Sequence, residues 1–465
     1  MSKGWRDCKA WVDYGIPLTT TSNEASKLFD ASLTQYVGWY NEESLGGLEA
    51  TCVKTVEADP NFVMGHVIKN GLDVLGTGRT IRLDQEFDKD IKRMVSLAES
   101  NGITDRERKH VNAVRLWAEG EMIAAANVWE DILVTYPKDM LAIKFAHDSY
   151  FYLGQHPQMR DSIARVLPAW NKRMPLYGYL MGMHAFGLEE CNLYQQAEIA
   201  ARQGLDINHK DAWSTHAMAH VLEMQGRFEE GINFMSNTEN DWNTCVMIAC
   251  HNYWHYGVYN IEKGTYDDAL GIFDSEVLKR SRNSGALLDL VDASSLLYRL
   301  QMEGVNVKDR WQDVFDLCQP HIEDHIMTFN DAHILFACLG SEKQEVSKRL
   351  IDTLKDFVRN GKGDNRRISE EVGVPLCEGI MAYENGDYAR AVDLMYPIRY
   401  KIITIGGSHA QRDVFNQLLI QAALKSTRKD HCRMARSLLT ERKALKQTAP
   451  LTDRLMAKAM AVHVE

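Results

Sequence analysis

The sequence predicts an all-α fold made of repeated antiparallel helix pairs, and three observations predict it. Apolar residues recur with the spacing of amphipathic helices, turn residues recur at nearly constant intervals, and small residues stand where paired helices approach closely. At 465 residues, with 45% hydrophobic and 25% charged residues, the chain can bury a substantial core. No linker rich in Gly, Ser or Pro interrupts it, so we expect one continuous right-handed superhelix over residues 1–465.

The predicted turns carry the repeat. Gly120, Gly154, Asn192, Gly226 and Gly264 are separated by 34, 38, 34 and 38 residues. That spacing suits a unit of two antiparallel helices of three to four turns each. Because each pair leaves one apolar face uncovered, only stacking onto a neighbouring pair completes the core.

These turns divide the chain into expected repeats. The clearest cover about 106–139, 140–173, 178–211, 212–245, 250–283 and 372–405. Residues 24–100 are expected to form an N-terminal helical cap region, and residues 406–465 a C-terminal one. The repeat is degenerate between Gly264 and Gly386, where residues 303–312 are predicted to be the loop between two pairs.

The amino-acid sequences of the repeats resemble those of known families. In NIEKGTYDDALGIFD an aromatic residue and an alanine stand two and five residues after the turn glycine, as in ENGDYARAVDLMYP, and these units resemble tetratricopeptide repeats. Longer phrases, among them TTSNEASKLFDASLTQYV, ACHNYWHYGVYNIEKG and GGSHAQRDVFNQLLI, make the chain resemble the tetratricopeptide repeat protein 38 family from about residue 19 to about residue 420. The resemblance implies a helical-repeat fold and no particular reaction.

The composition of the chain argues against some classes of partner and predicts where the protein is located. The formal net charge of −11 argues against nucleic acid or an anionic membrane surface as a partner. No apolar run approaches the roughly 18 residues of a membrane span, and the start MSKGWRDCKAW lacks the apolar stretch of a secretory signal. The nine cysteines form no CxxC pair, which predicts reduced thiols and a cytoplasmic location.

Histidines gather on two of the predicted first helices, which line the concave face of stacked pairs. His216, His220 and Glu223 stand at i, i+4 and i+7, within about 60° of arc on a helix. The family resemblance implies that these positions face the groove.

The next first helix carries His251 and His255, again four residues apart, with Trp254 between them. His216 lies ten residues before one turn glycine and His255 nine before the next. We therefore expect the two to lie nearly level on neighbouring helices, whose axes are about 8–10 Å apart.

The chemistry of this cluster has three alternatives. His216, His220, Glu223 and His255 could ligate a metal, since a zinc site needs three or four such ligands at about 2.0–2.1 Å. Neither histidine pair has the His-Glu-x-x-His pattern of zinc proteases. The same residues could line a pocket for a small polar ligand or a peptide, or they could be structural histidines.

Further polar residues extend the candidate ligand-binding face: Asp292, Arg299, Asp331, His333 and Arg412. The first two lie on a largely apolar helix, where buried charges must find partners. Arg412 follows a capping-box pattern at Ser408 and Gln411, whose helix start could hold an anion. Alternatively, that cap ends an irregular loop and Arg412 pairs with an acidic neighbour.

Three functions follow. The first is a cytoplasmic binding protein whose inner face takes a small polar ligand or a peptide, the former if the concavity is closed and the latter if it is open. The second is a metal-dependent or acid–base enzyme that uses the inner histidines. The third is an adaptor that binds a protein partner through its outer face. The sequence specifies no cofactor.

Overall fold

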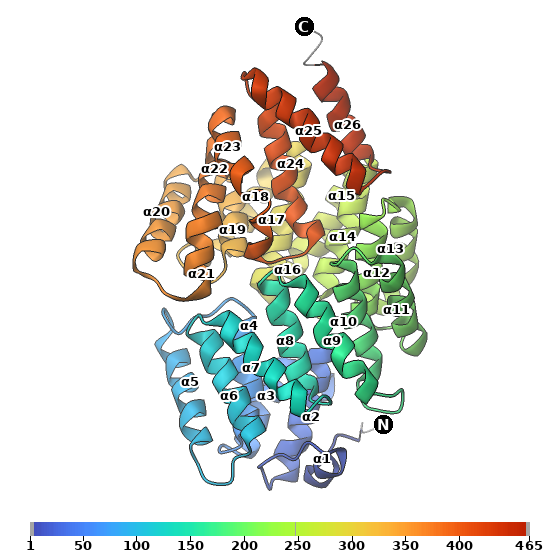
Figure 1. Cartoon of the computed structure of the whole chain (residues 1–465), viewed down its shortest axis with the longest axis vertical. Helices are drawn as coiled ribbons and strands as arrows, with labels where there is room; N and C mark the ends of the chain where they lie inside the picture. The colour runs from blue at the N-terminus through green and yellow to red at the C-terminus, as the bar shows by residue number, and fades with distance from the viewer. Residues whose placement is uncertain (1–3, 247, 462–465) are drawn as a thin grey trace. The chain divides into compact units, whose positions relative to one another are not determined.

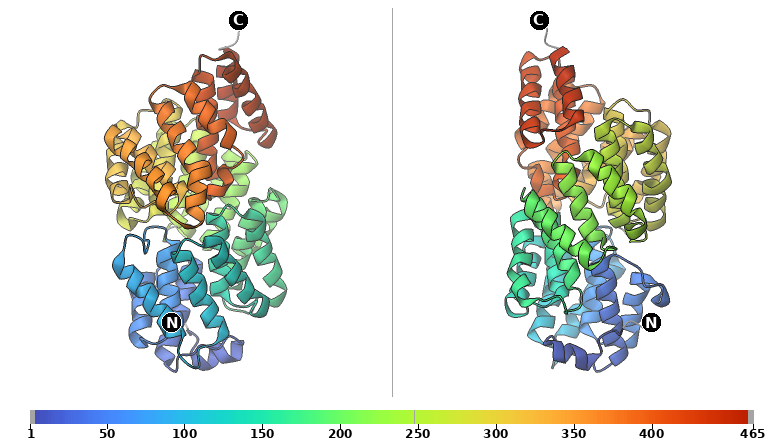
Figure 2. Two further views of the ribbon diagram at one scale, coloured as in Figure 1. Left: turned by 60° about the vertical axis from the view of Figure 1, so that its left-hand side comes forward. Right: turned by 90° about the vertical axis from the view of Figure 1, so that its right-hand side faces the viewer.

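The computed structural model describes residues 4–246 and 248–461, and all regular structure in those ranges is helical (Figures 1 and 2). Successive helices pack as antiparallel pairs, which confirms the predicted helical-repeat fold. By compactness the chain divides into unit 1 (Met1–Ala217 and Asp241–Ile248) and unit 2 (Met218–Asn240 and Ala249–Glu465). A single continuous domain stays a prediction.

Unit 1 begins with a short helix and continues as five helix pairs. Their bounds are α1 (Cys8–Tyr14), α2 (Asn23–Gly38), α3 (Gly47–Ala58), α4 (Val63–Leu75), α5 (Gln85–Ala98), α6 (Asp105–Ala118), α7 (Met122–Thr135), α8 (Met140–Tyr152), α9 (His156–Val166), α10 (Tyr177–Glu189) and α11 (Tyr194–Ile207). Short 3₁₀ turns, η1 (Glu43–Leu45) and η2 (Leu167–Ala169), precede α3 and follow α9.

The boundary between the units falls inside α12 (Ala212–Met224), and α13 (Phe228–Trp242) also carries residues of both. Unit 2 continues through α14 (Ile248–Lys263), α15 (Tyr266–Ile272), α16 (Leu278–Ser284), α17 (Leu287–Met302), α18 (Lys308–Cys318), α19 (Thr328–Gly340), α20 (Gln344–Asn360), α21 (Gly363–Ile368), α22 (Val374–Glu384), α23 (Tyr388–Met395), α24 (His409–Lys425), α25 (Lys429–Leu445) and α26 (Pro450–Ala461). The π-helical segments η3 (Phe273–Val277) and η5 (Ser369–Gly373) join α15 to α16 and α21 to α22, and η4 (Gln319–His321), η6 (Tyr396–Ile398) and η7 (Ile402–Ile405) are 3₁₀ turns.

The predicted turn residues adopt the left-handed conformation that ends one helix and begins the next. Their φ angles are 91° at Gly120, 64° at Gly154, 61° at Asn192, 71° at Gly226 and 91° at Gly264. Glycine reaches this region without a Cβ clash, and asparagine tolerates it better than most residues.

Two further turns of the same kind lie in the stretch where the sequence repeat is degenerate. Gly304 (φ 87°) joins α17 to α18, and Glu342 (φ 59°) joins α19 to α20. The expectation that residues 303–312 form a loop between two pairs is therefore wrong, because this turn lies within a pair and α18 already begins at Lys308. The turn residue Glu342 could not be recognised from the sequence, because glutamate has no preference for a positive φ.

The C-terminal helices of unit 2 pack back onto its earlier helices. Helix α24 contacts α17 as well as α23, and it lies in front of α17 in Figure 1. The loop before α26 reaches the α12–α13 turn, where a Cβ on Gly226 would lie 2.1 Å from the carbonyl oxygen of Thr448. Glu262 of α14 accepts from the Leu451 amide at 2.9 Å and from Lys446 Nζ at 3.2 Å.

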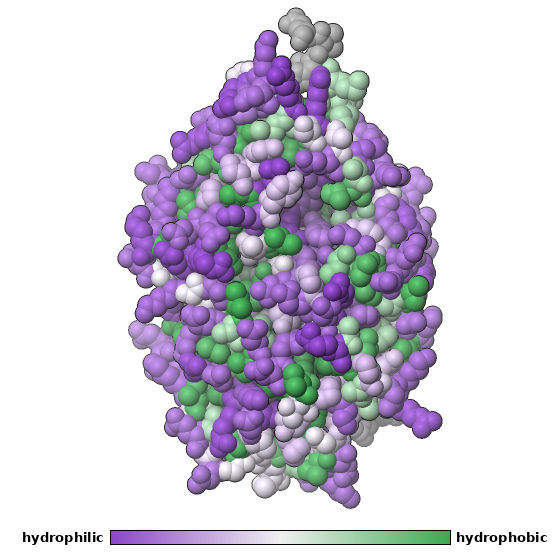
Figure 3. All heavy atoms as spheres, viewed as in Figure 1, coloured by the Kyte–Doolittle hydropathy of each residue, from purple (hydrophilic) through white to green (hydrophobic). Residues whose placement is uncertain are grey.

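The face of the molecule in Figure 3 is mostly hydrophilic, with hydrophobic side chains in small scattered groups. Among the helices of residues 4–246 and 248–461, none combines the length and the apolar character that crossing a membrane requires.

Candidate functional site

Three histidines of unit 2 come together. One ring nitrogen of each of His220, His251 and His255 lies within 4.8 Å of the others. The His220 ring centroid is 4.2 Å from that of His255 and 6.0 Å from that of His251, and the latter two are 4.7 Å apart. The turn spacing placed His216 level with His255, an expectation that stays a prediction; within unit 2 it is His220 that is aligned with His255.

Close packing of α14 against α12 and α13 produces this alignment. Tyr259, one turn after His255 on α14, donates its hydroxyl to the carbonyl of Ala219 at 2.5 Å. A Cβ on Gly231 of α13 would lie 2.4 Å from the Tyr259 ring, so α13 can approach only with glycine there. The tyrosine therefore fixes the height of α14 relative to His220.

Two carboxylates hold two of the rings. His251 Nδ1 lies 2.8 Å from Asp292 Oδ2, and His255 Nδ1 lies 3.0 Å from Glu223 Oε2. Gln411 Nε2 of α24 donates to the other oxygen of Asp292 at 3.2 Å. Because a carboxylate accepts, Nδ1 of both rings carries the proton and each Nε2 keeps a lone pair.

Burial sets the charge of the cluster. His220 and His255 are fully buried, and this burial, reinforced by neighbouring imidazoles, lowers the pKa of each well below its ordinary value. Burial raises the pKa of Glu223. The two buried rings are therefore neutral at neutral pH, and their ring nitrogens are able to act as bases or ligands.

Arg299 lies next to the cluster and ties α17 to α24. Its Nη2 donates to the carbonyl of Ala410 at 2.6 Å, and its guanidinium lies 5.4 Å from the Trp254 ring centroid. Burial alone would raise the pKa of Asp413, but Arg442 and Arg299 beside it hold that pKa well below its usual range. Arg299 thus has the partners that a buried cation needs.

Trp254 stacks on His251, with ring centroids 5.1 Å apart and planes 9° from parallel. The Trp254 side chain is fully buried. It supports one wall of the cluster and is not exposed for a ligand to stack on.

The capping box predicted before α24 is present. The Gln411 amide donates to Ser408 Oγ at 3.1 Å, and the Ser408 amide donates to Gln411 Oε1 at 3.1 Å. Arg412 donates to the carbonyls of Gly406 and Gly407 and so closes the loop onto the helix start.

Asp331 and His333 make other contacts. Asp331 Oδ1 accepts from His325 Nδ1 at 2.9 Å, and His333 donates Nδ1–H to the carbonyl of Phe329 at 2.7 Å. The His333 ring centroid lies 5.3 Å from that of Phe415, and burial lowers its pKa to about 3. Their part in binding a ligand stays a prediction.

His216 belongs to unit 1 and is buried. It stands one turn before His220 on α12, and its ring centroid lies 4.8 Å from that of Phe186 and 5.6 Å from that of Trp213. Its role as a ligand stays a prediction.

Sequence reasoning treated Gln411 only as a capping residue. In the structure the same side chain caps α24 with its oxygen and holds Asp292 with its nitrogen. No local signal joins these two residues, because they are 119 positions apart.

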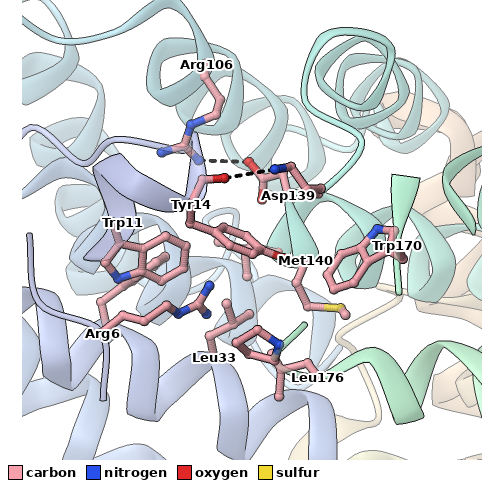
Figure 4. A pocket seen from close by; sticks show the side chains of 13 residues that line it. Arg6, Trp11, Tyr14, Leu33, Arg106, Asp139, Met140, Trp170 and Leu176 are labelled. Atoms are coloured by element: carbon pink, nitrogen blue, oxygen red, sulfur yellow. Dashed lines mark hydrogen bonds and ion pairs between the residues drawn. The ribbon is translucent and has the colours of Figure 1, made fainter. Parts of the chain in front are cut away.

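Unit 1 contains a small pocket that the sequence did not predict (Figure 4). Its volume of about 10 Å³, room for about one water molecule, lies among side chains that include Trp11 and Tyr14. Its cations already have partners: Arg6 contacts Asp30 at 2.5 Å, Arg106 contacts Asp139 at 2.8 Å, and Lys138 donates to the Tyr14 carbonyl at 3.0 Å. The pocket therefore offers little charge for a ligand to neutralise.

No model of a protein family matches the sequence. Among solved structures, a human IFIT1 dimer with m7Gppp-AAAA is similar over 99% of this chain and 98% of its own, with 14% identity and a TM-score of 0.39. The Cut9–Hcn1 hetero-tetramer of APC/C (94% and 84%, 9% identity, TM-score 0.40) and yeast Tom70 (96% and 90%, 13% identity, TM-score 0.34) are also similar.

Proposed function

We propose that this chain is a cytoplasmic binding protein of the tetratricopeptide repeat protein 38 family, and that it binds a small polar ligand at the histidine cluster of unit 2. The observation that carries the proposal is the pair of carboxylate–imidazole contacts, Asp292 with His251 and Glu223 with His255. They hold two of three histidine rings that lie together, and such buried polar groups are costly unless they are paired.

The packing of the C-terminal helices supports a small ligand over a peptide. Arg299 and Asp292 of α17 contact Ala410 and Gln411 of α24, on the side of α17 where the cluster lies. An extended peptide along this side would have to displace α24.

Burial favours a small molecule or ion over a larger ligand. His220 and His255 are 0% exposed, so a ligand would reach them from the side of His251, whose side chain is 13% exposed. The net charge of −11 supports a partner other than nucleic acid, and a protein partner would use the polar outer surface.

Native mass spectrometry of the purified full chain tests the proposal. We expect a mass above that of the polypeptide, which returns to the bare mass in His255→Asn. Asparagine can still donate to Glu223, so this variant removes Nε2 and keeps the hydrogen bond. The control is His333→Asn, an equally buried histidine outside the cluster, which should keep the added mass. A bare wild-type mass, or equal loss in the control, would refute the proposal.

A further inference from the structure

We propose that His220, His251 and His255 bind a divalent transition-metal ion of the zinc type, with Asp292 and Glu223 orienting two of the ligands. This inference rests on the proposed function and names the chemical class of the ligand at the same site.

The donor set is the first argument. Neutral imidazole nitrogen is a preferred ligand of Zn²⁺ and of neighbouring divalent transition metals, whereas Mg²⁺ and Ca²⁺ prefer oxygen. In a tetrahedral zinc site with Zn–N of about 2.0–2.1 Å, the ligand nitrogens lie about 3.3 Å apart. The three nitrogens here already lie within 4.8 Å of one another, so small rotations of the rings bring them to that spacing.

The second argument concerns the hydrogen-bond partners of the histidines and not their spacing. A histidine that ligates a metal almost always donates its other N–H to a carboxylate, a carbonyl or water, which fixes the ring and raises its basicity. His251 and His255 both do this through Nδ1, to Asp292 and Glu223. The carboxylate of Asp292 is itself held by Gln411. Two of the three proposed ligands therefore have the hydrogen-bonded carboxylate that commonly holds a histidine ligand in metal sites.

Charge favours a cation over an anion. A neutral imidazole has a lone pair on its unprotonated nitrogen, which attracts a cation and repels an anion. The Arg299 guanidinium is paired with Asp413 and donates to the carbonyl of Ala410, and Arg412 donates to the carbonyls of Gly406 and Gly407. Asp292 and Glu223 supply the negative charge that a buried divalent ion requires.

The cluster is reachable and can be completed. The His251 side chain is 13% exposed, so an ion can enter from that side. Three protein ligands leave a fourth position for solvent or another group. His216, predicted from the sequence as a further ligand, stands one turn before His220 on the same helix.

Glu223 is reassigned by this geometry. The sequence places it among the candidate ligands, whereas its carboxylate contacts the Nδ1 atom of His255. We therefore assign it as a positioning residue. Glu223→Gln keeps an acceptor for Nδ1–H and removes the negative charge, so Zn²⁺ affinity should fall by about 10–100-fold.

The test is Zn²⁺ binding by the full chain after treatment with a chelator, followed by calorimetry and elemental analysis. We expect about one Zn²⁺ per wild-type chain, and no stoichiometric Zn²⁺ in His251→Asn or His255→Asn. The control His333→Asn should bind as the wild type does. Wild-type protein that binds no Zn²⁺, or a His255→Asn variant with unchanged affinity, would overturn the inference.

A second measurement needs no variant and covers the case in which substitutions prevent folding. X-ray absorption at the zinc edge of the loaded wild type should report nitrogen ligands with imidazole scattering at about 2.0–2.1 Å. Sulfur ligands would overturn the inference. If native mass spectrometry instead finds an organic ligand in metal-free chain, lost in His255→Asn, the metal inference fails while the proposed function stands. A bare mass refutes both.

Discussion

Lys144 in unit 1 offers a sharp test of how the fold tolerates buried charge. Its Nζ lies 2.5 Å from both carboxylate oxygens of Asp148 and 4.6, 4.9 and 4.7 Å from the ring centroids of Tyr36, Trp39 and Trp213. The Lys144 side chain is 0% exposed and that of Asp148 13%. The perturbation is Lys144→Met, which keeps the apolar length of the side chain and removes the charge.

The expected loss of stability in Lys144→Met depends on the partners that Asp148 keeps. Removing one partner of a buried ion pair typically costs about 3–5 kcal/mol, because the other charge is left uncompensated. Here Asp148 keeps the hydroxyl of Tyr36 at 2.6 Å and has His147 Nδ1 at 3.7 Å, which places the cost near the lower end. We expect the free energy of unfolding to fall by about 3 kcal/mol.

The double variant Lys144→Met/Asp148→Asn separates lost charge compensation from lost packing. Asparagine still accepts from Tyr36, so the double variant should lie within about 1 kcal/mol of the wild type, since replacing both charges of a buried pair is often neutral. Asp148→Asn alone leaves the Lys144 charge uncompensated and should also cost about 3 kcal/mol, so the coupling energy between the two sites would be about 5 kcal/mol.

Urea unfolding followed by tryptophan fluorescence and circular dichroism measures these differences, provided that the slope with urea is unchanged. A Lys144→Met variant as stable as the wild type would refute the reasoning. So would a double variant that is less stable than Lys144→Met alone.

Two further predictions concern unit 2. Burial, together with the nearby Asp292 charge, raises the pKa of Asp289 to about 7, against about 3.9 when unfolded. The protonated Asp289 therefore contributes its full stability below about pH 4, and that contribution is lost as the pH rises toward 7. Asparagine does not titrate, so Asp289→Asn should gain about 2–3 kcal/mol in free energy of unfolding relative to the wild type between pH 5 and pH 8. Urea unfolding at the two pH values measures this difference. An unchanged difference would contradict this assignment. Gly231→Ala should destabilise by about 1–3 kcal/mol, because its Cβ would meet the Tyr259 ring at 2.4 Å, whereas Gly271→Ala, with no atom within 4 Å of its Cβ, should stabilise by about 0.4–1 kcal/mol. Equal thermal shifts for the two glycine variants would show that close packing is not what sets the effect.

Local sequence patterns predicted the helix pairs well because turns are encoded locally. Gly120, Gly226 and Gly264 stand where the backbone needs a positive φ, and helical spacing of apolar residues fills the segments between them. Gly304 carried the same signal but was hidden by an atypical sequence around it. Glu342 carried none, because glutamate has no preference for a positive φ.

Part of the candidate site could likewise be predicted from the sequence, and part could not. Sequence alone placed His216, His220 and Glu223 on one face of a helix, and the turn spacing placed His255 level with His216. Only the structure put the ring of His255 next to that of His220. Only the tertiary structure brought Asp292 to His251, because the two are 41 residues apart on helices whose contact has no local signature. It likewise gave His333 a backbone carbonyl as partner.

The sequence by itself thus determined the class of fold, the main turns and the helix faces that carry histidine, all of which depend on residues within one or two helical turns. The tertiary structure decided which carboxylate holds which ring, that Gln411 reaches Asp292, and that α24 packs beside the cluster. Those contacts depend on the stacking of pairs far apart in the chain, where the burial of apolar surface, which has no direction of its own, selects the neighbours.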